Sequence, residues 1–135
     1  MDKCRFCEIV EREHPADIIF EDDLVVAFLD HVPLTPGHSL VIPRVHFPNM
    51  LDVPAPMLAG IFSRVQNIAR ATKSAVSAEG MLIVSNATIQ QTVPHFHVHI
   101  VPRWQDDGVM GFCGPRVDPG ETQSIARQIR ELLRR

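Results

Sequence analysis

Three histidines at every second position from His95 to His99 constrain the fold of this chain more than any other feature. Apolar residues alternate with them at Phe96, Val98 and Ile100, and each of these three is aromatic or β-branched. Such alternation predicts a β-strand over residues 95–101. Because successive side chains of a strand point to opposite faces, we expect the imidazoles on one face and the apolar side chains on the other. Polar rings that titrate near neutral pH are costly to keep in a core, so this face is predicted to serve chemistry.

Apolar patterns elsewhere predict an α+β fold. Short apolar runs bounded by polar turns are expected to form further strands at residues 18–21, 24–30, 38–43 and 81–85. Apolar residues at three- and four-residue steps predict a long helix over 56–78, stopped by Gly80, and a C-terminal helix over 122–135. This order of elements favours an antiparallel sheet of about five strands over a parallel βαβ array.

Length and composition limit the classes of protein to which the chain can belong. Its 135 residues predict a single domain, with a core of about residues 4–104 and a tail over 105–135. With a net charge of −3, the chain is not expected to bind nucleic acid or anionic membranes through a general basic field. No apolar run approaches the ~20 residues of a membrane span, and the first residues lack the apolar part of a signal peptide. We therefore expect a cytoplasmic protein whose three cysteines do not form a disulfide framework.

Two kinds of chemistry would use three imidazoles on one face of a strand. A zinc site with three histidine ligands is one candidate. His95 and His99 would, however, lie about 13 Å apart along a strand that rises ~3.3 Å per residue, so joint coordination would strain their side chains. The other candidate is nucleophilic catalysis, in which a neutral imidazole attacks phosphorus. The middle ring, His97, is the best-placed nucleophile because its two neighbours can donate hydrogen bonds to phosphate oxygens.

Several motifs, found in order along the chain, resemble those of the histidine triad (HIT) superfamily. The run from His95 to Val101 is similar to the family's His-φ-His-φ-His-φ-φ signature, in which φ is apolar. The other similar segments are Phe20–Asp23, Ala27–Asp30, Gly37–His46, Gln91-Thr92-Val93 and Pro102-Arg103. The resemblance covers roughly residues 4 to 104. It implies an α+β fold that binds nucleotides, commonly as a homodimer with a continuous sheet.

The resemblance also implies a role for each histidine of the pattern. His97 would be the nucleophile, and His99 would contact the phosphate. The backbone of His95 would help to orient His97, and His38 would line the phosphate pocket. Thr92 would assist the phosphate or the leaving group, unless it is an ordinary strand residue. The implied reaction passes through a nucleotidyl-histidine and releases a nucleoside monophosphate, expected to be AMP. Its implied substrates are phosphoramidates, adenylyl-linked compounds and dinucleoside polyphosphates.

A further set of residues is implied to hold an AMP-like purine nucleotide. Phe6, Ile9 and Phe28 would form the walls of the base pocket, although the same three residues would also suit a plain core. Asp30 would accept hydrogen bonds from the ribose hydroxyls, and the alternative is a carboxylate that caps a turn.

The loop before the triad departs from the family's pattern. Asn86 and Gln91, at its two ends, match polar pocket residues of the family. In the small nucleotide-binding branch this loop is commonly rich in glycine, whereas residues 86–91 contain none. Fewer residues here favour a positive φ. Recognition of the leaving group at this edge is therefore expected to differ.

Cys4 and Cys7 form a C-x2-C pair that, alone, would fit a redox pair, two unremarkable thiols or half of a metal site. Some bacterial HIT proteins, and similarly galactose-1-phosphate uridylyltransferases, hold zinc with two cysteines and two histidines. That resemblance implies a structural Zn²⁺ site made of Cys4, Cys7, His46 and His95. No comparable role is predicted for Cys113, and no magnesium requirement is predicted because no magnesium motif is present.

These features together predict a nucleotide hydrolase or nucleotidyl transferase of the HIT superfamily. The alternative, from another class, is a nucleotide-binding or scaffold protein that keeps the fold without significant turnover.

Overall fold

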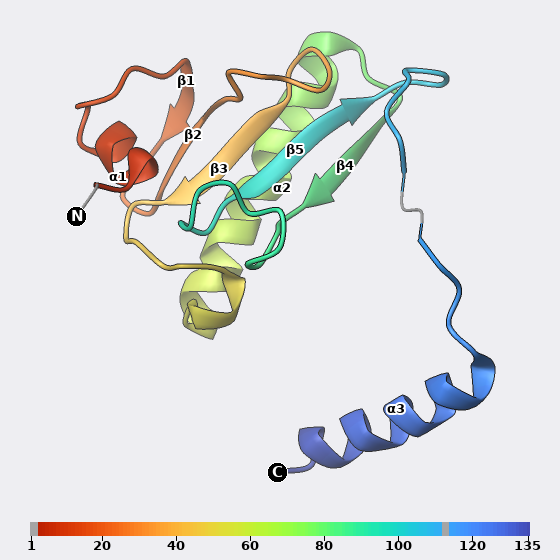
Figure 1. Cartoon of the computed structure of the whole chain (residues 1–135). Coiled ribbons are helices and arrows are strands. Elements are labelled where there is room, and N and C mark those ends of the chain that lie inside the picture. Colours follow the sequence, from red (N-terminus) through yellow and green to blue (C-terminus); the bar gives the residue numbers. More distant parts are fainter. Residues whose placement is uncertain (1–2, 112–113) are drawn as a thin grey trace.

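The computed structural model describes residues 3–111 and 114–135, which contain a five-stranded antiparallel sheet (Figure 1). The strands are β1 (Ile18–Glu21), β2 (Val25–Leu29), β3 (Ser39–Pro43), β4 (Gly80–Val84) and β5 (Val98–Arg103). They lie side by side in the order β1-β2-β3-β5-β4. The helices are α1 (Arg5–Val10), α2 (Ala55–Val76) and α3 (Pro119–Leu133), and a 3-10 turn spans Met50–Asp52. The predicted α+β class and antiparallel sheet are confirmed.

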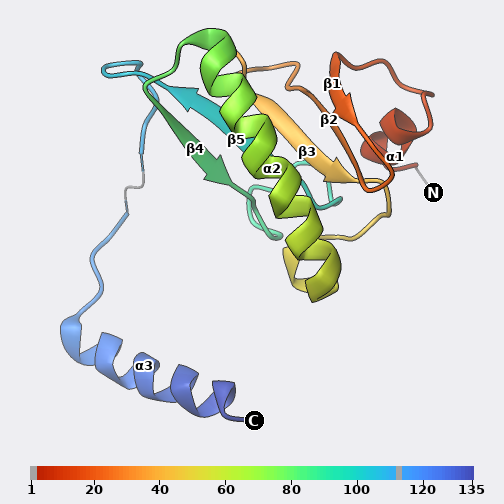
Figure 2. The same ribbon diagram turned by 180° about the vertical axis from the view of Figure 1, so that it is seen from behind.

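The long helix α2 packs across β3, β4 and β5 on one face of the sheet (Figure 2). Phe96, Val98 and Ile100 are fully buried in the core cluster beneath it, together with Ile61 and Val65 of the helix. The apolar half of the alternating pattern is therefore confirmed. Because the intervening side chains point the other way, the histidines are directed to the face opposite α2.

The short helix α1 lies against that opposite face. Its Phe6 and Ile9 are buried with Phe28 and Leu40 of the sheet in a second apolar cluster. The sequence patterns do not predict α1, because a six-residue helix with two buried residues is too short to show helical periodicity. This helix closes one side of the site described below.

The predicted strand over residues 95–101 is wrong at its start, because β5 begins at Val98. Pairing between β3 and β5 ends at Val41 and Val98. Farther along β3, Pro43 has no N–H to donate, and its carbonyl accepts a hydrogen bond from Nε2 of His95 at 2.9 Å. The His95 side chain thus replaces a backbone hydrogen bond between the strands, and His95 and His97 precede β5.

The predicted end of α2 also needs correction. The helix ends at Val76, and Ser77 adopts the left-handed conformation (φ 53°). Backbone N–H groups there satisfy the carbonyls of Lys73 and Ser74. Gly80, predicted as the stop, instead begins β4. The other predicted boundaries lie within three residues of the observed ones.

The C-terminal helix α3 stands apart from the sheet and from α2 in both views (Figures 1 and 2). The Asp118 carboxylate caps its first turn by accepting hydrogen bonds from the N–H groups of Gly120 and Glu121. None of the residues of α3 is buried. In the part of the chain that the structure describes, no helix is both long and apolar enough to cross a membrane. Cys113, for which no role is predicted, lies outside the described residues.

Candidate active site and metal cluster

A cavity of about 800 Å³ opens on the face of the sheet opposite α2. Its apolar walls are Phe6 and Ile9 of α1 with Phe28 and Leu40 of the sheet. Its polar lining includes Asp30, Thr92, His97 and His99. The structure therefore brings most of the residues predicted for catalysis and nucleotide binding to one cavity, which has both apolar walls and histidine side chains.

His97 is held with one ring nitrogen free. Its Nδ1 lies 2.7 Å from the carbonyl oxygen of His95, and since a carbonyl can only accept, Nδ1 carries the proton. In the neutral ring Nε2 then keeps its lone pair. Burial lowers the pKa of His97, which favours this neutral form. The hydroxyl of Ser85 donates to the His97 carbonyl at 2.6 Å and fixes the backbone beneath the ring.

His38 and His99 form a hydrogen-bonded pair of defined direction. The backbone N–H of Leu34 donates to Nδ1 of His38 at 3.0 Å, so the proton of a neutral His38 must be on Nε2. That Nε2 lies 3.0 Å from Nδ1 of His99, which accepts. The remaining nitrogen of His99, Nε2, is therefore a donor. His99 lines the cavity, whereas His38 is buried behind it and does not.

Both rings of this pair are disposed to stay neutral. Burial lowers the pKa of His38, and burial together with the neighbouring rings of His97 and His38 lowers the pKa of His99 to about 4. A neutral His99 offers one N–H donor to the cavity at neutral pH. This is a group suited to a phosphate oxygen.

The two carboxylate oxygens of Asp30 have different partners. Its Oδ1 accepts a hydrogen bond from the N–H of Val32 at 2.9 Å, which is the turn-capping geometry. Its Oδ2 lies 3.5 Å from Nε2 of His38 and borders the cavity. The turn cap and a second role facing the cavity are thus compatible in one side chain.

Cys4, Cys7, His46 and His95 converge next to the cavity, at the start of α1. Nδ1 of His95 lies 3.5 and 3.6 Å from the sulfurs of Cys4 and Cys7, and 3.1 Å from Nδ1 of His46. Nδ1 of His46 lies 3.4 Å from the sulfur of Cys7. A tetrahedral zinc ion with ordinary Zn–S and Zn–N bonds separates its ligands by about 3.3–3.8 Å. The cluster therefore has the donor set and the spacing of a closed tetrahedral zinc site.

The protonation of His95 also fits a metal ligand. Its Nε2 must donate to the carbonyl of Pro43, so Nδ1 keeps a lone pair and points into the cluster. Burial lowers the pKa of His95 to about 4, so the ring stays neutral. Burial raises the pKa of the Cys7 thiol to about 11, which is the opposite of the lowered value typical of a redox-active C-x2-C pair.

Asp30, His38 and His99 form a second group of potential metal ligands. Coordination there would use Nε2 of His38, which would have to lose its proton. The proton would then have to sit on Nδ1, where the N–H of Leu34 already points. The backbone therefore opposes a metal at this cluster and favours a chain of hydrogen bonds.

Two residues predicted for the pocket, Asn86 and Gln91, do not line the cavity. The amide of Gln91 instead donates to the carbonyl of Pro48 at 2.6 Å and accepts from the N–H of Thr88 at 3.0 Å. It ties the loop before the triad to the loop that follows His46. Although the loop lacks glycine, Thr88 and Gln90 both adopt positive φ, at 72° and 60°.

Comparison with known proteins identifies the family of this chain. The HIT domain matches residues 11–106, well over half of the chain. The chain belongs to the HIT family. The structure of SMU.412c from Streptococcus mutans superposes with a TM-score of 0.89, at 38% identity, over 98% of this chain and 87% of that one. A zinc-bound histidine triad family protein of Mycobacterium smegmatis superposes with a TM-score of 0.75, at 37% identity, over 96% and 94% of the two chains.

A further HIT relative carries the name of an enzyme. The adenylylsulfatase HINT3 of Arabidopsis thaliana is 36% identical over 77% of this chain. The chain spans 54% of the length of that protein. One relative of this chain is thus named as a hydrolase.

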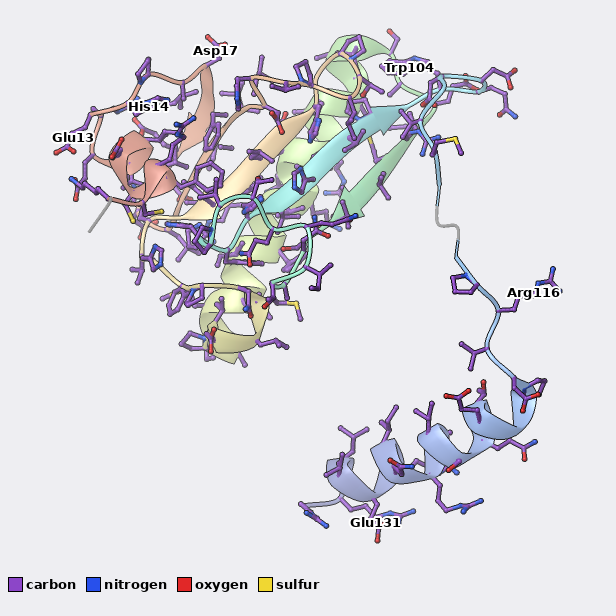
Figure 3. All side chains as sticks on the ribbon, viewed as in Figure 1. Glu13, His14, Asp17, Trp104, Arg116 and Glu131 are labelled. Atoms are coloured by element: carbon purple, nitrogen blue, oxygen red, sulfur yellow. The ribbon has the colours of Figure 1, made fainter. Side chains whose placement is uncertain are left out.

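Several groups of the HIT site escape reasoning from sequence. The orienting partners of three histidines are backbone atoms, the carbonyls of Pro43 and His95 and the N–H of Leu34, which no residue type reveals. His14 and Asp17, on the segment between α1 and β1, also line the cavity, and Figure 3 labels both. A strand-start signal at Ile18 was the one clue that this segment lies near the sheet.

Proposed function

We propose that this HIT protein is a nucleotide hydrolase that forms a nucleotidyl-histidine at His97. The observation that carries the proposal is the Nε2 lone pair of His97, which lines a cavity that also has apolar walls and the His99 ring. The likeness to an adenylylsulfatase supports a substrate with an adenylyl group joined to a leaving group. Phosphoramidates, adenylyl-linked compounds and dinucleoside polyphosphates all have that design.

In the proposed first step Nε2 of His97 attacks the α-phosphorus in line with the leaving group. The nitrogen–phosphorus bond forms while the bond from phosphorus to the leaving atom breaks, and the leaving group departs with the electron pair and takes a proton from solvent where it needs one. Nε2–H of His99 donates to a phosphoryl oxygen, where negative charge develops. Thr92, which lines the same cavity, assists the phosphate or the leaving group.

In the second step water attacks the same phosphorus. The bond to His97 breaks, its Nε2 regains the lone pair, the water proton is released, and the nucleoside monophosphate leaves. Because Nδ1 remains bonded to the His95 carbonyl in both steps, the ring keeps its orientation throughout the cycle. No step requires Mg²⁺.

The nucleotide would occupy the cavity with its base against the apolar walls. Phe6, Ile9 and Phe28 would wall the base, and Asp30 would accept from the ribose hydroxyls. The edge of the Phe6 ring also meets His97, with the ring centroids 5.0 Å apart. Binding of the base and orientation of the nucleophile would thus share one side chain of α1.

The proposed metal is Zn²⁺, bound by Cys4, Cys7, His46 and His95. The zinc-bound neighbour and the tetrahedral ligand spacing support it. With four protein ligands the ion would be structural and would leave no position for water. Its role would be to hold the start of α1, and with it Phe6 and Ile9, against the sheet.

Two measurements test the proposed function. In a single turnover with an adenosine 5′-phosphoramidate, neutral-pH mass spectrometry of the protein should reveal one added adenylyl group, located on His97 by peptide mapping. A substrate panel with that phosphoramidate, an adenylyl sulfate and diadenosine tri- and tetraphosphate should identify the preferred leaving group. Tight nucleotide binding with neither adduct nor turnover across the panel would favour the alternative, a nucleotide-binding or scaffold protein.

A further inference from the structure

Ser85 directly follows β4 and supports the backbone of His97 from the neighbouring strand. Its hydroxyl donates a hydrogen bond to the main-chain carbonyl of His97, with 2.6 Å between the two oxygens. The two residues are twelve positions apart in the sequence. In Figure 1 the loop between them leaves the end of β4 and returns to the start of β5. The serine therefore joins the strand before this loop to the residue proposed as the nucleophile.

The pairing of β5 with both of its neighbours ends before it reaches His97. The last pair between β4 and β5 is Val84 and His99, and the same register, if continued, would place Asn86 opposite His97. β4 ends at Val84, however, and the last residue of β5 that pairs with β3 is Val98. The carbonyl of His97 therefore lies beyond the ladder, and a side-chain hydroxyl supplies its hydrogen bond.

Two hydrogen bonds of different origin determine where the Nε2 lone pair of His97 lies. The bond from Nδ1 to the carbonyl of His95, at 2.7 Å, sets the rotation of the ring. The bond from Ser85 sets the position of the main chain from which the ring projects. The rings of Phe6 and His99 flank the imidazole, each with its centroid 5.0 Å away. Because these neighbours restrict the ring, a shift of the His97 main chain would move Nε2 with it.

We propose that Ser85 is a positioning residue that aligns His97 for in-line attack on the α-phosphorus. The inference rests on the proposed function, because that function makes His97 the nucleophile. In-line displacement requires the attacking nitrogen, the phosphorus and the leaving atom to lie close to one line. A misplacement of about 1 Å can lower the rate of such a step by on the order of 10²-fold. Ser85 does not line the cavity, so its effect should appear in kcat and not in KM.

The test compares Ser85→Thr with Ser85→Val in the full chain. Threonine and valine have nearly the same shape, and only threonine keeps the hydroxyl. We expect Ser85→Val to lower kcat, and the single-turnover rate of nucleotidyl transfer to His97, about tenfold, with KM changed by less than about twofold. Ser85→Thr should keep at least about half of the parent kcat. Ser85→Ala, which removes the hydroxyl without adding bulk, should show the same loss as the valine variant.

The matched control is Thr72→Val on α2, which packs on the other face of the sheet. The hydroxyl of Thr72 also donates to a main-chain carbonyl, that of Ile68 at 2.8 Å, and Thr72 does not line the cavity. Its loss should keep kcat at the parent value. The Tm of every variant is measured alongside. A lower Tm with an unchanged kcat in Ser85→Val, or an equal loss of kcat in the threonine and valine variants, would overturn the proposal.

A measurement without turnover separates this inference from the proposed function. The ¹H and ¹⁵N signals of the His97 ring are compared by NMR in protein without nucleotide. We expect them to move in Ser85→Val and to stay near the parent positions in Ser85→Thr and Thr72→Val. Absence of an adduct on His97 in the parent protein would refute the proposed function, and with it this role of Ser85. An adduct in the parent, with kcat and ring signals unchanged in Ser85→Val, would refute the role of Ser85 alone.

Discussion

Two clusters of similar residues lie on the same face of the sheet, and one hydrogen atom distinguishes them. In the first cluster His95 meets the carbonyl of Pro43, so its other nitrogen keeps a lone pair for a metal. In the second His38 meets the N–H of Leu34, so its other nitrogen carries a proton and donates to His99. Both rings are buried and neutral. The backbone group that a histidine meets therefore decides whether it is a ligand or a donor.

His97 should show the largest effect of any single substitution near the two clusters. His97→Ala is expected to lower turnover at least about 10⁴-fold, because it removes the Nε2 lone pair of the proposed nucleophile. Nucleotide affinity, measured by calorimetry, should change little. The matched control is Gln66→Ala, which changes an exposed residue of α2 that does not line the cavity and should keep full activity. Substantial turnover by the His97 variant would refute the proposed nucleophile.

Disruption of the metal cluster should act on stability more than on the reaction. Cys4→Ser is expected to abolish stoichiometric zinc in elemental analysis and to lower the Tm by about 10 °C, because the start of α1 loses its anchor. Cys113→Ser, the matched control, should keep both. If the Cys4 variant retains zinc and melts with the parent protein, this cluster is not the structural site.

Substitution of His38 should separate donation from metal binding in the second cluster. His38→Leu removes the donor to Nδ1 of His99 and should lower kcat by about 10–100-fold with little change in KM. His38→Gln keeps an N–H at a similar distance and should recover much of that loss. The pH profile of kcat should change in the leucine variant alone. Equal damage by both variants would point to a packing role.

The smallest effect is expected in the pH dependence of stability. Burial lowers the pKa of His99 to about 4, whereas an unfolded histidine titrates near 6.5. Below pH 6.5 the ring of His99 is protonated in the unfolded chain but still neutral in the folded one. Its contribution to the free energy of unfolding is therefore fully present above pH 6.5 and is lost as the pH falls toward 4. After a discount for solvent screening we expect a loss of about 1–2 kcal/mol from this ring, measured by urea unfolding at pH 7.5 and pH 5. His99→Asn should lose this part of the slope, and Gln66→Ala, at an exposed position of α2, should keep it.

The sequence predicted the fold well because apolar periodicity reports on burial. Phe96, Val98 and Ile100 all lie under α2 as their alternation indicates. The same alternation placed His95 in a strand that it does not join, since the carbonyl of Pro43 is taken by the imidazole. Periodicity registers which face a side chain occupies and carries no information about which backbone groups are already bonded.

The candidate site was predictable to the same extent. Residue types and motif resemblance named the side chains that gather around the cavity, including Phe6, Asp30 and His99. They misjudged Gln91, whose amide is used between two loops and does not line the cavity. Its distance from the cavity depends on the shape of a short loop with positive φ at Thr88 and Gln90, and neither residue type favours that conformation.

The hydrogen bond from Nδ1 of His97 to the carbonyl of residue 95 has a consequence for which substitutions such a protein can accept in evolution. The ring of the proposed nucleophile is oriented by the main-chain carbonyl of His95, and that carbonyl is present whatever side chain position 95 bears. The imidazole at 95, by contrast, directs its Nδ1 to the proposed metal site and donates from Nε2 to the carbonyl of Pro43. The proposed metal site and the proposed nucleophile therefore depend on different atoms of residue 95, the first on its side chain and the second on its main chain. A lineage can discard the first by exchanging side chains and still inherit the second.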